Sequence, residues 1–394
     1  MHANRCLSWA LTFLVFNSET VTARPWHDTL NPLYSRLEPW IPSSLLKRSN
    51  VDLNPNGTTF LWLIDDVFQG KTFFDNFDFF KWADPTNGRV NYIDKDAAFA
   101  QGLAFVTDDD KVIMQGDNTT WLDRGQFRNS VRIQGHKQYN TGLFILDVDK
   151  APWGCAVWPA FWTVGMGGWP QSGEIDIIEG VHDNSHNQVT WHSGTGCHLT
   201  PNATFSGTVV EMDGKQHLDC DGNLPGNPGC GITEWSRASY GPLFDAQGGG
   251  VYAMKWDENG ISVWSFYRAA VPQDITDGSP NPSGWGVPVG TLLPTNCNPL
   301  SQYFYNHSVI FDITFCGDWA GNSYATSGCP GTCEDRLMDP NNFVNATWII
   351  NSLKIYRKTM LNTRPANAAP RLDVPIAQLG VWGVLLFVLS ASVL

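Results

Sequence analysis

Three acidic residues lie within one short segment of this chain, Gly173–Gly180, which reads Gly-Glu-Ile-Asp-Ile-Ile-Glu-Gly. Its isoleucines favour a β-strand, in which Glu174 and Asp176 point to one face and the intervening isoleucine to the other. Strict alternation would send Glu179 to the isoleucine face, but one β-bulge between Asp176 and Glu179 restores the parity. We therefore expect three carboxylates along one strip of a concave sheet.

Carboxyl groups crowded in this way can break a glycosidic bond. A retaining glycosidase uses one carboxylate as nucleophile and a second group, about 5–5.5 Å away, as acid and then base. Like charges at close range cannot all ionise freely, so one group keeps its proton near neutral pH. Asp176 would hydrogen bond one glutamate and help set which group holds the proton. The alternative is a polar edge strand whose acids only face solvent.

Tryptophan is concentrated beside these acids. The chain has 18 Trp, and three of them, Trp158, Trp162 and Trp169, precede the acidic segment, while Trp191-His192 follows it. Indole rings pack on the apolar faces of sugar rings, so this cluster is typical of carbohydrate subsites. Core packing is the alternative for most of the other tryptophans.

The composition indicates a folded all-β protein. A net charge of −13 argues against nucleic-acid binding, because phosphate contacts need clustered Lys and Arg. Short apolar runs alternate with Gly, Asn, Asp and Pro clusters and long helical periods are absent, which predicts a β-sandwich or barrel. The clearest runs are Val131–Ile133, Leu143–Val148, Val189–His192, Ile261–Tyr267, Val309–Phe315 and Trp348–Tyr356.

Taken together, these blocks resemble glycoside hydrolase family 16, specifically the fungal laminarinase-like endo-1,3(4)-β-glucanases, over about Phe60–Arg357. Besides Gly173–Gly180, the resemblance rests on Phe73–Phe77, Asp84–Tyr92, Arg128–Arg132, Trp158–Ala160 and Phe315–Gly321. It implies an all-β fold, a β-jelly-roll sandwich of two antiparallel sheets with a concave substrate cleft. Neither an organic cofactor nor a metal site is predicted, and we expect a monomer.

The resemblance also implies roles for particular residues. Glu174 corresponds to the nucleophile, Glu179 to the acid/base, and Asp176 to the assisting residue between them. The positions that it places around the cleft, as substrate-binding residues, are Trp158, Trp162, Trp169, His192, Arg132 and Trp319. A structural surface histidine is the alternative for His192, and a structural salt-bridge partner is the alternative for Arg132.

The spacing of the acids favours one group within this family. Glu-x-Asp-x-x-Glu marks the bulged, laminarinase-like type, whereas lichenases and xyloglucan transglycosylases have Glu-x-Asp-x-Glu. The predicted function is retaining endo-hydrolysis of β-1,3-glucan and mixed β-1,3/1,4-glucan through a glycosyl-enzyme intermediate. Two alternatives remain: a cell-wall β-glucan transglycosylase, and a non-catalytic glucan-binding surface protein.

The sequence also predicts export. Residues 1–23 have a basic residue, a short apolar run and the small-residue site Val21-Thr22-Ala23, as in a signal peptide. Residues 24–59 are expected to be a linker or pro-segment, in which Lys47-Arg48 is either a processing site or a chance pair. The catalytic domain is expected over residues 60–357.

The last segments predict a surface anchor. Residues 358–378 form a polar stalk, and residues 379–394 form a hydrophobic tail typical of a GPI-anchor signal. Asn367 is the best attachment candidate, and a short tail-anchor helix is the alternative.

Cysteines agree with an oxidising compartment. Beyond Cys6 in the predicted signal there are eight, which suggests disulfides of undetermined pairing. The close pair Cys329 and Cys333 invites a metal interpretation, but the disulfide interpretation is favoured because no second pair accompanies it. Five Asn-x-Ser/Thr sequons, at Asn56, Asn118, Asn202, Asn306 and Asn345, fit a secreted glycoprotein.

Overall fold

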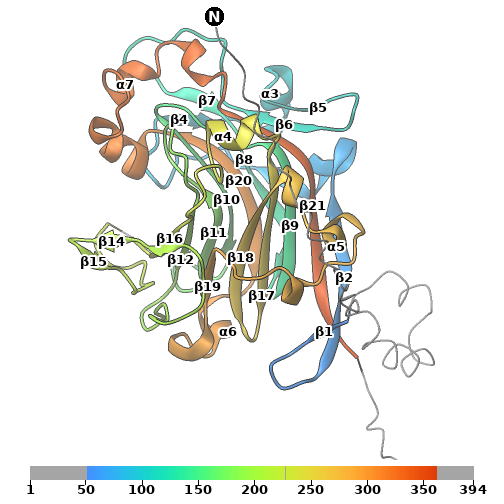
Figure 1. The fold of residues 1–394 in the computed structure, drawn as a ribbon. Coiled ribbons are helices and arrows are strands. Elements are labelled where there is room, and N and C mark those ends of the chain that lie inside the picture. The colour runs from blue at the N-terminus through green and yellow to red at the C-terminus, as the bar shows by residue number, and fades with distance from the viewer. Residues whose placement is uncertain (1–50, 227, 362–394) are drawn as a thin grey trace, which may run out of the picture. The chain divides into compact units, whose positions relative to one another are not determined.

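The computed structural model describes residues 51–226 and 228–361, which form two large antiparallel β-sheets (Figure 1). The first sheet has nine strands. In spatial order they are β1 (Asp52–Leu53), β2 (Thr59–Phe68), β21 (Thr347–Met360), β9 (Gly142–Lys150), β17 (Gly250–Asp257), β18 (Gly260–Tyr267) and β19 (Gly290–Leu292), with β6 (Val112–Gln115) paired to β21 and β5 (Ala104–Val106) to β6.

The second sheet has eight strands and carries the acidic segment at its centre. In spatial order they are β13 (Thr208–Val209), β16 (Cys230–Thr233), β12 (Gln188–His192), β11 (Glu174–Glu179), β10 (Val157–Gly165), β20 (His307–Phe315), β8 (Arg132–Tyr139) and β3 (Phe77–Phe79). Two small pairs lie outside both sheets: β4 (Val90–Tyr92) with β7 (Arg128–Ser130), and β14 (Glu211–Met212) with β15 (Lys215–Gln216).

The described helices are all short and lie in the connections. The α-helices are α3 (Lys95–Ala100), α4 (Pro242–Ala246), α5 (Gln273–Thr276), α6 (Leu300–Tyr303) and α7 (Cys333–Arg336). Tighter or wider turns are η1 (Gly70–Asn76), η2 (Arg268–Ala270), η3 (Pro282–Gly284), η4 (Pro294–Asn296), η5 (Gly317–Gly321), η6 (Tyr324–Thr326) and η7 (Pro340–Phe343). Across the described part of the chain, no helix is both long and apolar enough to cross a membrane.

The two sheets share one hydrophobic core. Ile175 on β11 and Phe161 on β10 are buried in the same cluster as Phe144 on β9 and Met254 on β17. Phe161 also stacks on Phe311 of β20, with 4.6 Å between ring centroids. Because side chains alternate along a strand, burying this face turns the opposite face of the second sheet away from the core.

The predicted all-β sandwich and its main strands are confirmed. Each of the six apolar runs lies in an observed strand, β8, β9, β12, β18, β20 or β21, with ends that differ by a few residues. Residues 51–59, expected in the linker, include β1, and the start of the expected stalk continues β21 to Met360. The predicted signal, the dibasic pair, Asn367 and the hydrophobic tail lie outside the described residues.

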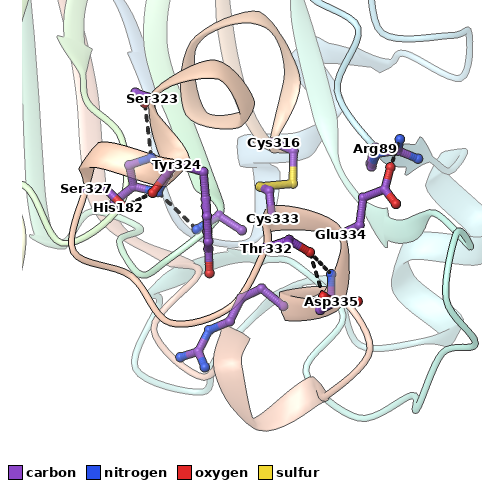
Figure 2. Close-up of a disulfide and its surroundings, with 12 residues drawn as sticks. Arg89, His182, Cys316, Ser323, Tyr324, Ser327, Thr332, Cys333, Glu334 and Asp335 are labelled. Carbon is purple, nitrogen blue, oxygen red and sulfur yellow. Dashed lines mark hydrogen bonds and ion pairs between the residues drawn. A yellow bond between two sulfur atoms is a disulfide. The ribbon is translucent and has the colours of Figure 1, made fainter.

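All eight domain cysteines form disulfides. The pairs are Cys155–Cys329, Cys197–Cys297, Cys220–Cys230 and Cys316–Cys333. The disulfide interpretation is therefore confirmed, and Cys329 and Cys333 belong to different pairs. Figure 2 shows Cys316–Cys333 joining the start of η5 to α7, with the Arg89–Glu334 ion pair beside it.

The Cys316–Cys333 disulfide closes a loop with a sequence separation of 17 residues. In the chain-entropy model such a crosslink stabilises the fold by about 3 kcal/mol. We expect the double variant Cys316→Ser/Cys333→Ser to lose roughly this much free energy of unfolding in urea titrations. An unchanged unfolding midpoint would show that the loop is held by other contacts.

Candidate active site

The acidic strand β11 carries one more residue than its neighbour β10. The ladder pairs, read along β11, are Glu174 with Val164, Asp176 with Trp162, Ile178 with Phe161 and Glu179 with Ala160. Ile177 has no partner and is the residue of the predicted bulge. Paired residues share a face of the sheet. The partners of the three acids are alternate residues of β10 and therefore lie on one face. The three carboxylates lie on that same face.

Tryptophan indoles bind the carboxylates of this surface. Each of three rings donates its N–H to a different acid: Trp158 Nε1 to Glu179 Oε1 at 3.0 Å, Trp162 Nε1 to Asp312 Oδ2 at 2.9 Å, and Trp169 Nε1 to Glu174 Oε2 at 2.7 Å. These bonds fix the orientation of the carboxylates. The ring of Trp169 remains 41% exposed, so it is also open to a ligand.

His192 completes the acidic cluster from the neighbouring strand. It pairs with Glu174 in the ladder between β11 and β12, and its Nε2 lies 3.4 Å from Asp176 Oδ2. One ligand atom from each of these three residues falls within 4.8 Å of the others. The set could therefore hold a cation, but it equally fits acid–base chemistry, in which a histidine stabilises nearby anions.

Burial raises the pKa of all three carboxyl groups. Loss of water, reinforced by the charge of Asp176, raises the pKa of Glu174 to about 8. Burial raises the pKa of Asp176 to about 8 as well, and only 2% of Asp176 is exposed. For Glu179, burial and then the charges of Asp176 and Glu174 hold the pKa well above its ordinary value. Protons are therefore retained in this strip near neutral pH.

The groups that favour ionisation differ between the two glutamates. His192, the Trp169 indole and Arg132 all lower the pKa of Glu174, against the larger effect of burial. For Glu179 the corresponding groups are the Trp158 indole and His192. More of the surroundings thus support an anion at Glu174, and two neighbouring carboxylates support a proton at Glu179.

Arg132 lies opposite Asp312 on β20, in the ladder row that continues through Ala160 to Glu179. Its guanidinium carbon is 4.5 Å from the centroid of the Phe80 ring and 4.9 Å from that of Trp162. Within residues 51–226 and 228–361 it forms no ion pair within 4.0 Å, and its Nε has no hydrogen-bond partner. The side chain is thus held by cation–π stacking rather than by the salt bridge considered as an alternative.

Trp319 reaches the same surface from the turn η5. Its ring meets Trp158 edge to face, with centroids 5.8 Å apart. Its carbonyl accepts a hydrogen bond from Ser323 Oγ. The same hydroxyl is hydrogen bonded to His182 Nε2, as Figure 2 shows. The disulfide at Cys316 anchors the start of this turn. All six predicted substrate-binding side chains are therefore gathered around the three acids.

The sequence reasoning missed three residues of this site. Asp312 bonds Trp162, and burial raises its pKa to about 7. Phe80 stacks on Arg132, and Asn187 binds the β11 backbone at the bulged Ile177 and at Glu179. A lone acid in the apolar run Val309–Phe315 could have indicated Asp312, whereas no pattern marks Asn187.

Comparisons with known proteins show which family this chain resembles. A family model described as the XgeA-like, catalytic GH16 domain matches residues 77–356. A probable glycosidase of Schizosaccharomyces pombe is 40% identical over 78% of this chain and 72% of its own length. An endo-1,3(4)-β-glucanase of Emericella nidulans is 37% identical over 75% of this chain, which spans about half (47%) of that relative.

Two solved structures are similar as well. GH16 laminarinase 16A from Phanerochaete chrysosporium, bound to 6-O-glucosyl-laminaritriose, is 41% identical with a TM-score of 0.71, covering 75% of this chain and 99% of its own. An elongating GH family 16 β-1,3-glucosyltransferase is 38% identical with a TM-score of 0.69, covering 75% of this chain and 100% of its own.

The electrostatics of the strip predict opposite effects for two substitutions. Asp176→Asn removes a negative charge that raises the pKa of Glu179, so this pKa should fall. Trp158→Phe removes an indole that favours the Glu179 anion, so the same pKa should rise. Titration of ¹³C-labelled glutamate carboxyl groups by NMR measures both shifts.

Glu234 provides an internal control for this titration. It is a buried acid whose pKa burial raises to about 7, and its carboxylate bonds Ser265 on β18 of the other sheet. Its titration should be unchanged in both variants. Equal shifts at Glu234 and Glu179, or Glu179 shifts in the same direction in both variants, would contradict these roles of Asp176 and Trp158.

Proposed function

The chain belongs to glycoside hydrolase family 16, and from this membership we propose that it hydrolyses β-1,3-glucan and mixed β-1,3/1,4-glucan internally, with retention of anomeric configuration. The observation that carries the proposal is the placement of Glu174, Asp176 and Glu179 on one face of β11 by the bulge at Ile177. A retaining glycosidase needs such a pair of carboxyl groups beside the scissile glycosidic bond.

In the proposed mechanism, Glu174 attacks the anomeric carbon while Glu179 donates its proton to the departing glycosidic oxygen. The glycosyl-enzyme then reacts with water, from which Glu179 takes a proton, and Glu174 leaves as a carboxylate. The assignment follows the electrostatics: His192, Trp169 and Arg132 favour the Glu174 anion, and the other two acids favour a proton on Glu179. Asp176 lies on the same face as both glutamates, 3.4 Å from His192 Nε2, and would help to share the protons.

We assign sugar binding to the aromatic and basic side chains around the acids. Trp169, with its exposed ring, lies beside Glu174, and Trp158 and Trp319 lie on the Glu179 side. Aromatic faces on both sides of the reacting acids would hold glucose units on both sides of the scissile bond, as endo-cleavage requires. The proposed ligand is a neutral β-glucan, for which neither a metal nor an organic cofactor is needed.

Transglycosylation is the second candidate. The glycosyl-enzyme is common to both reactions, and the outcome depends on whether water or a sugar hydroxyl attacks it. Similarity to an elongating β-1,3-glucosyltransferase at 38% identity favours this candidate, whereas the family names of several relatives favour hydrolysis. A non-catalytic glucan-binding role is disfavoured because both glutamates are present.

Product analysis separates these candidates. We expect laminarin to give shorter oligosaccharides from internal cleavage, with lichenan and barley glucan also cut, and ¹H NMR to show the β-anomer of the new reducing end first. Size-resolved chromatography measures the products over time. Chains longer than the substrate as the main product would support the transferase, and no change in any of the three glucans would exclude both enzymes.

Removing each glutamate tests its role. We expect Glu174→Ala to lower kcat on laminarin by about 10⁴-fold or more, because the nucleophile is lost. With added azide, this variant should form an α-glucosyl azide, whereas Glu179→Ala should form the β-anomer because Glu174 still reacts first. Glu234→Gln, which neutralises a buried acid bonded to Ser265, serves as the control and should keep its activity. Interchanged azide anomers would reverse the two assignments.

We also propose that the protein is exported and held at the cell surface. Four disulfides fit an oxidising compartment, and the sequon residues Asn56, Asn202 and Asn306 are exposed. The signal and the GPI attachment at Asn367 rest on sequence alone. Release of the protein from cells by phosphatidylinositol-specific phospholipase C would support the anchor, and an intact C-terminal tail in mass spectra would rule it out.

A further inference from the structure

Asn187 lies where the ladder between β11 and β12 ends. The last ladder pair is Asp176 with Thr190, although β11 continues to Glu179. Asn187 immediately precedes β12 and is fully buried. Its side-chain amide replaces the backbone partner that β12 no longer provides. Nδ2 donates to the Ile177 carbonyl at 2.9 Å, and Oδ1 accepts the Glu179 N–H at 2.9 Å.

These two bonds hold the unpaired Ile177 of the bulge and Glu179, and so flank Ile178 between them. A bulge interrupts the regular pairing of backbone groups, and buried backbone groups require partners. One carboxamide supplies both here, the donor from its nitrogen and the acceptor from its oxygen, so a single planar group bridges two backbone positions. The backbone between Ile177 and Glu179 is thereby held in a single conformation, and the direction of the Glu179 side chain follows from it.

Asn187 is itself firmly held. Its backbone N–H donates to Ser239 Oγ at 3.0 Å, and its carbonyl accepts the Glu234 N–H at 2.8 Å. With its amide engaged by β11 and no exposed surface, Asn187 does not touch a ligand in the cleft. Any effect on the reaction must therefore pass through the backbone of Glu179.

We propose that Asn187 is a positioning residue, which aims the Glu179 carboxyl group at the glycosidic oxygen by clamping the backbone across the bulge. The proposal rests on the function proposed above, because it requires Glu179 to supply the proton. Loss of the clamp should therefore impair bond cleavage that needs this proton and spare nucleophilic attack by Glu174.

Two substrates with different leaving groups separate these steps. Laminarin needs protonation of a departing sugar oxygen, whereas 2,4-dinitrophenyl β-laminaribioside releases a phenolate that needs no proton. We expect Asn187→Ala to lower kcat/KM on laminarin by about 10²-fold, the lower end of what general acid catalysis contributes, and on the aryl glycoside by no more than about threefold. All rates are divided by the concentration of active enzyme, which is measured from the burst of dinitrophenolate released in the first turnover.

Two further variants keep the test decisive. Asn187→Asp preserves the size of the side chain and the acceptor for the Glu179 N–H, so it should show the same split to a smaller degree if Asn187→Ala does not fold. Ser239→Ala is the matched control: it removes the partner of the Asn187 backbone N–H and leaves the amide bonds to β11 in place. For this variant, kcat/KM on laminarin and kcat/KM on the aryl glycoside should change by the same factor.

The outcomes are distinct. Equal losses on both substrates in the Asn187 variants, or no loss on laminarin, would overturn the positioning role while leaving the hydrolase intact. A wild-type protein that cleaves neither substrate would instead refute the proposed function.

Discussion

The active site depends on the parity of one strand. A β-strand that buries its isoleucines between two sheets can present acids only at alternate positions, and Glu179 lies five positions after Glu174, an odd number. Without an extra residue, Glu179 would point into the apolar core, where an unpaired charge is costly. The unpaired Ile177 resolves this conflict by shifting the register once, so the core stays apolar and the third acid reaches the open face.

Once the acids share a face, their burial determines the chemistry. Loss of water is the largest influence on the pKa of each of the three, and the charge of Asp176 opposes ionisation of both glutamates. The strip therefore holds protons near neutral pH, which an isolated surface carboxylate would have lost. His192 and the indoles bias where the protons lie. Retention of a proton on one acid and of a charge on another is what a retaining glycosidase requires.

The sequence predicted the bulge, the all-β sandwich and the gathering of the aromatic residues, because alternation along Gly173–Gly180 and the strand runs are local properties. It did not predict the residues that act from other strands. Asp312 comes to the site through the order of β10 and β20, and Asn187 through the end of a ladder. Sheet order and ladder ends arise from tertiary packing, which no spacing in a single sequence encodes. The same holds for the disulfide partners of Cys329 and Cys333.

The abundance of tryptophan acquires a second explanation from this geometry. Stacking on sugar would use only the faces of the rings, and phenylalanine or tyrosine could provide such faces. Here Trp158, Trp162 and Trp169 each donate an indole N–H to a carboxylate. Tryptophan has a large apolar face together with a hydrogen-bond donor at its edge, so one side chain can stabilise an acid and still offer its face to a glucose ring. A cleft that is both acidic and apolar therefore favours tryptophan over the other aromatic residues.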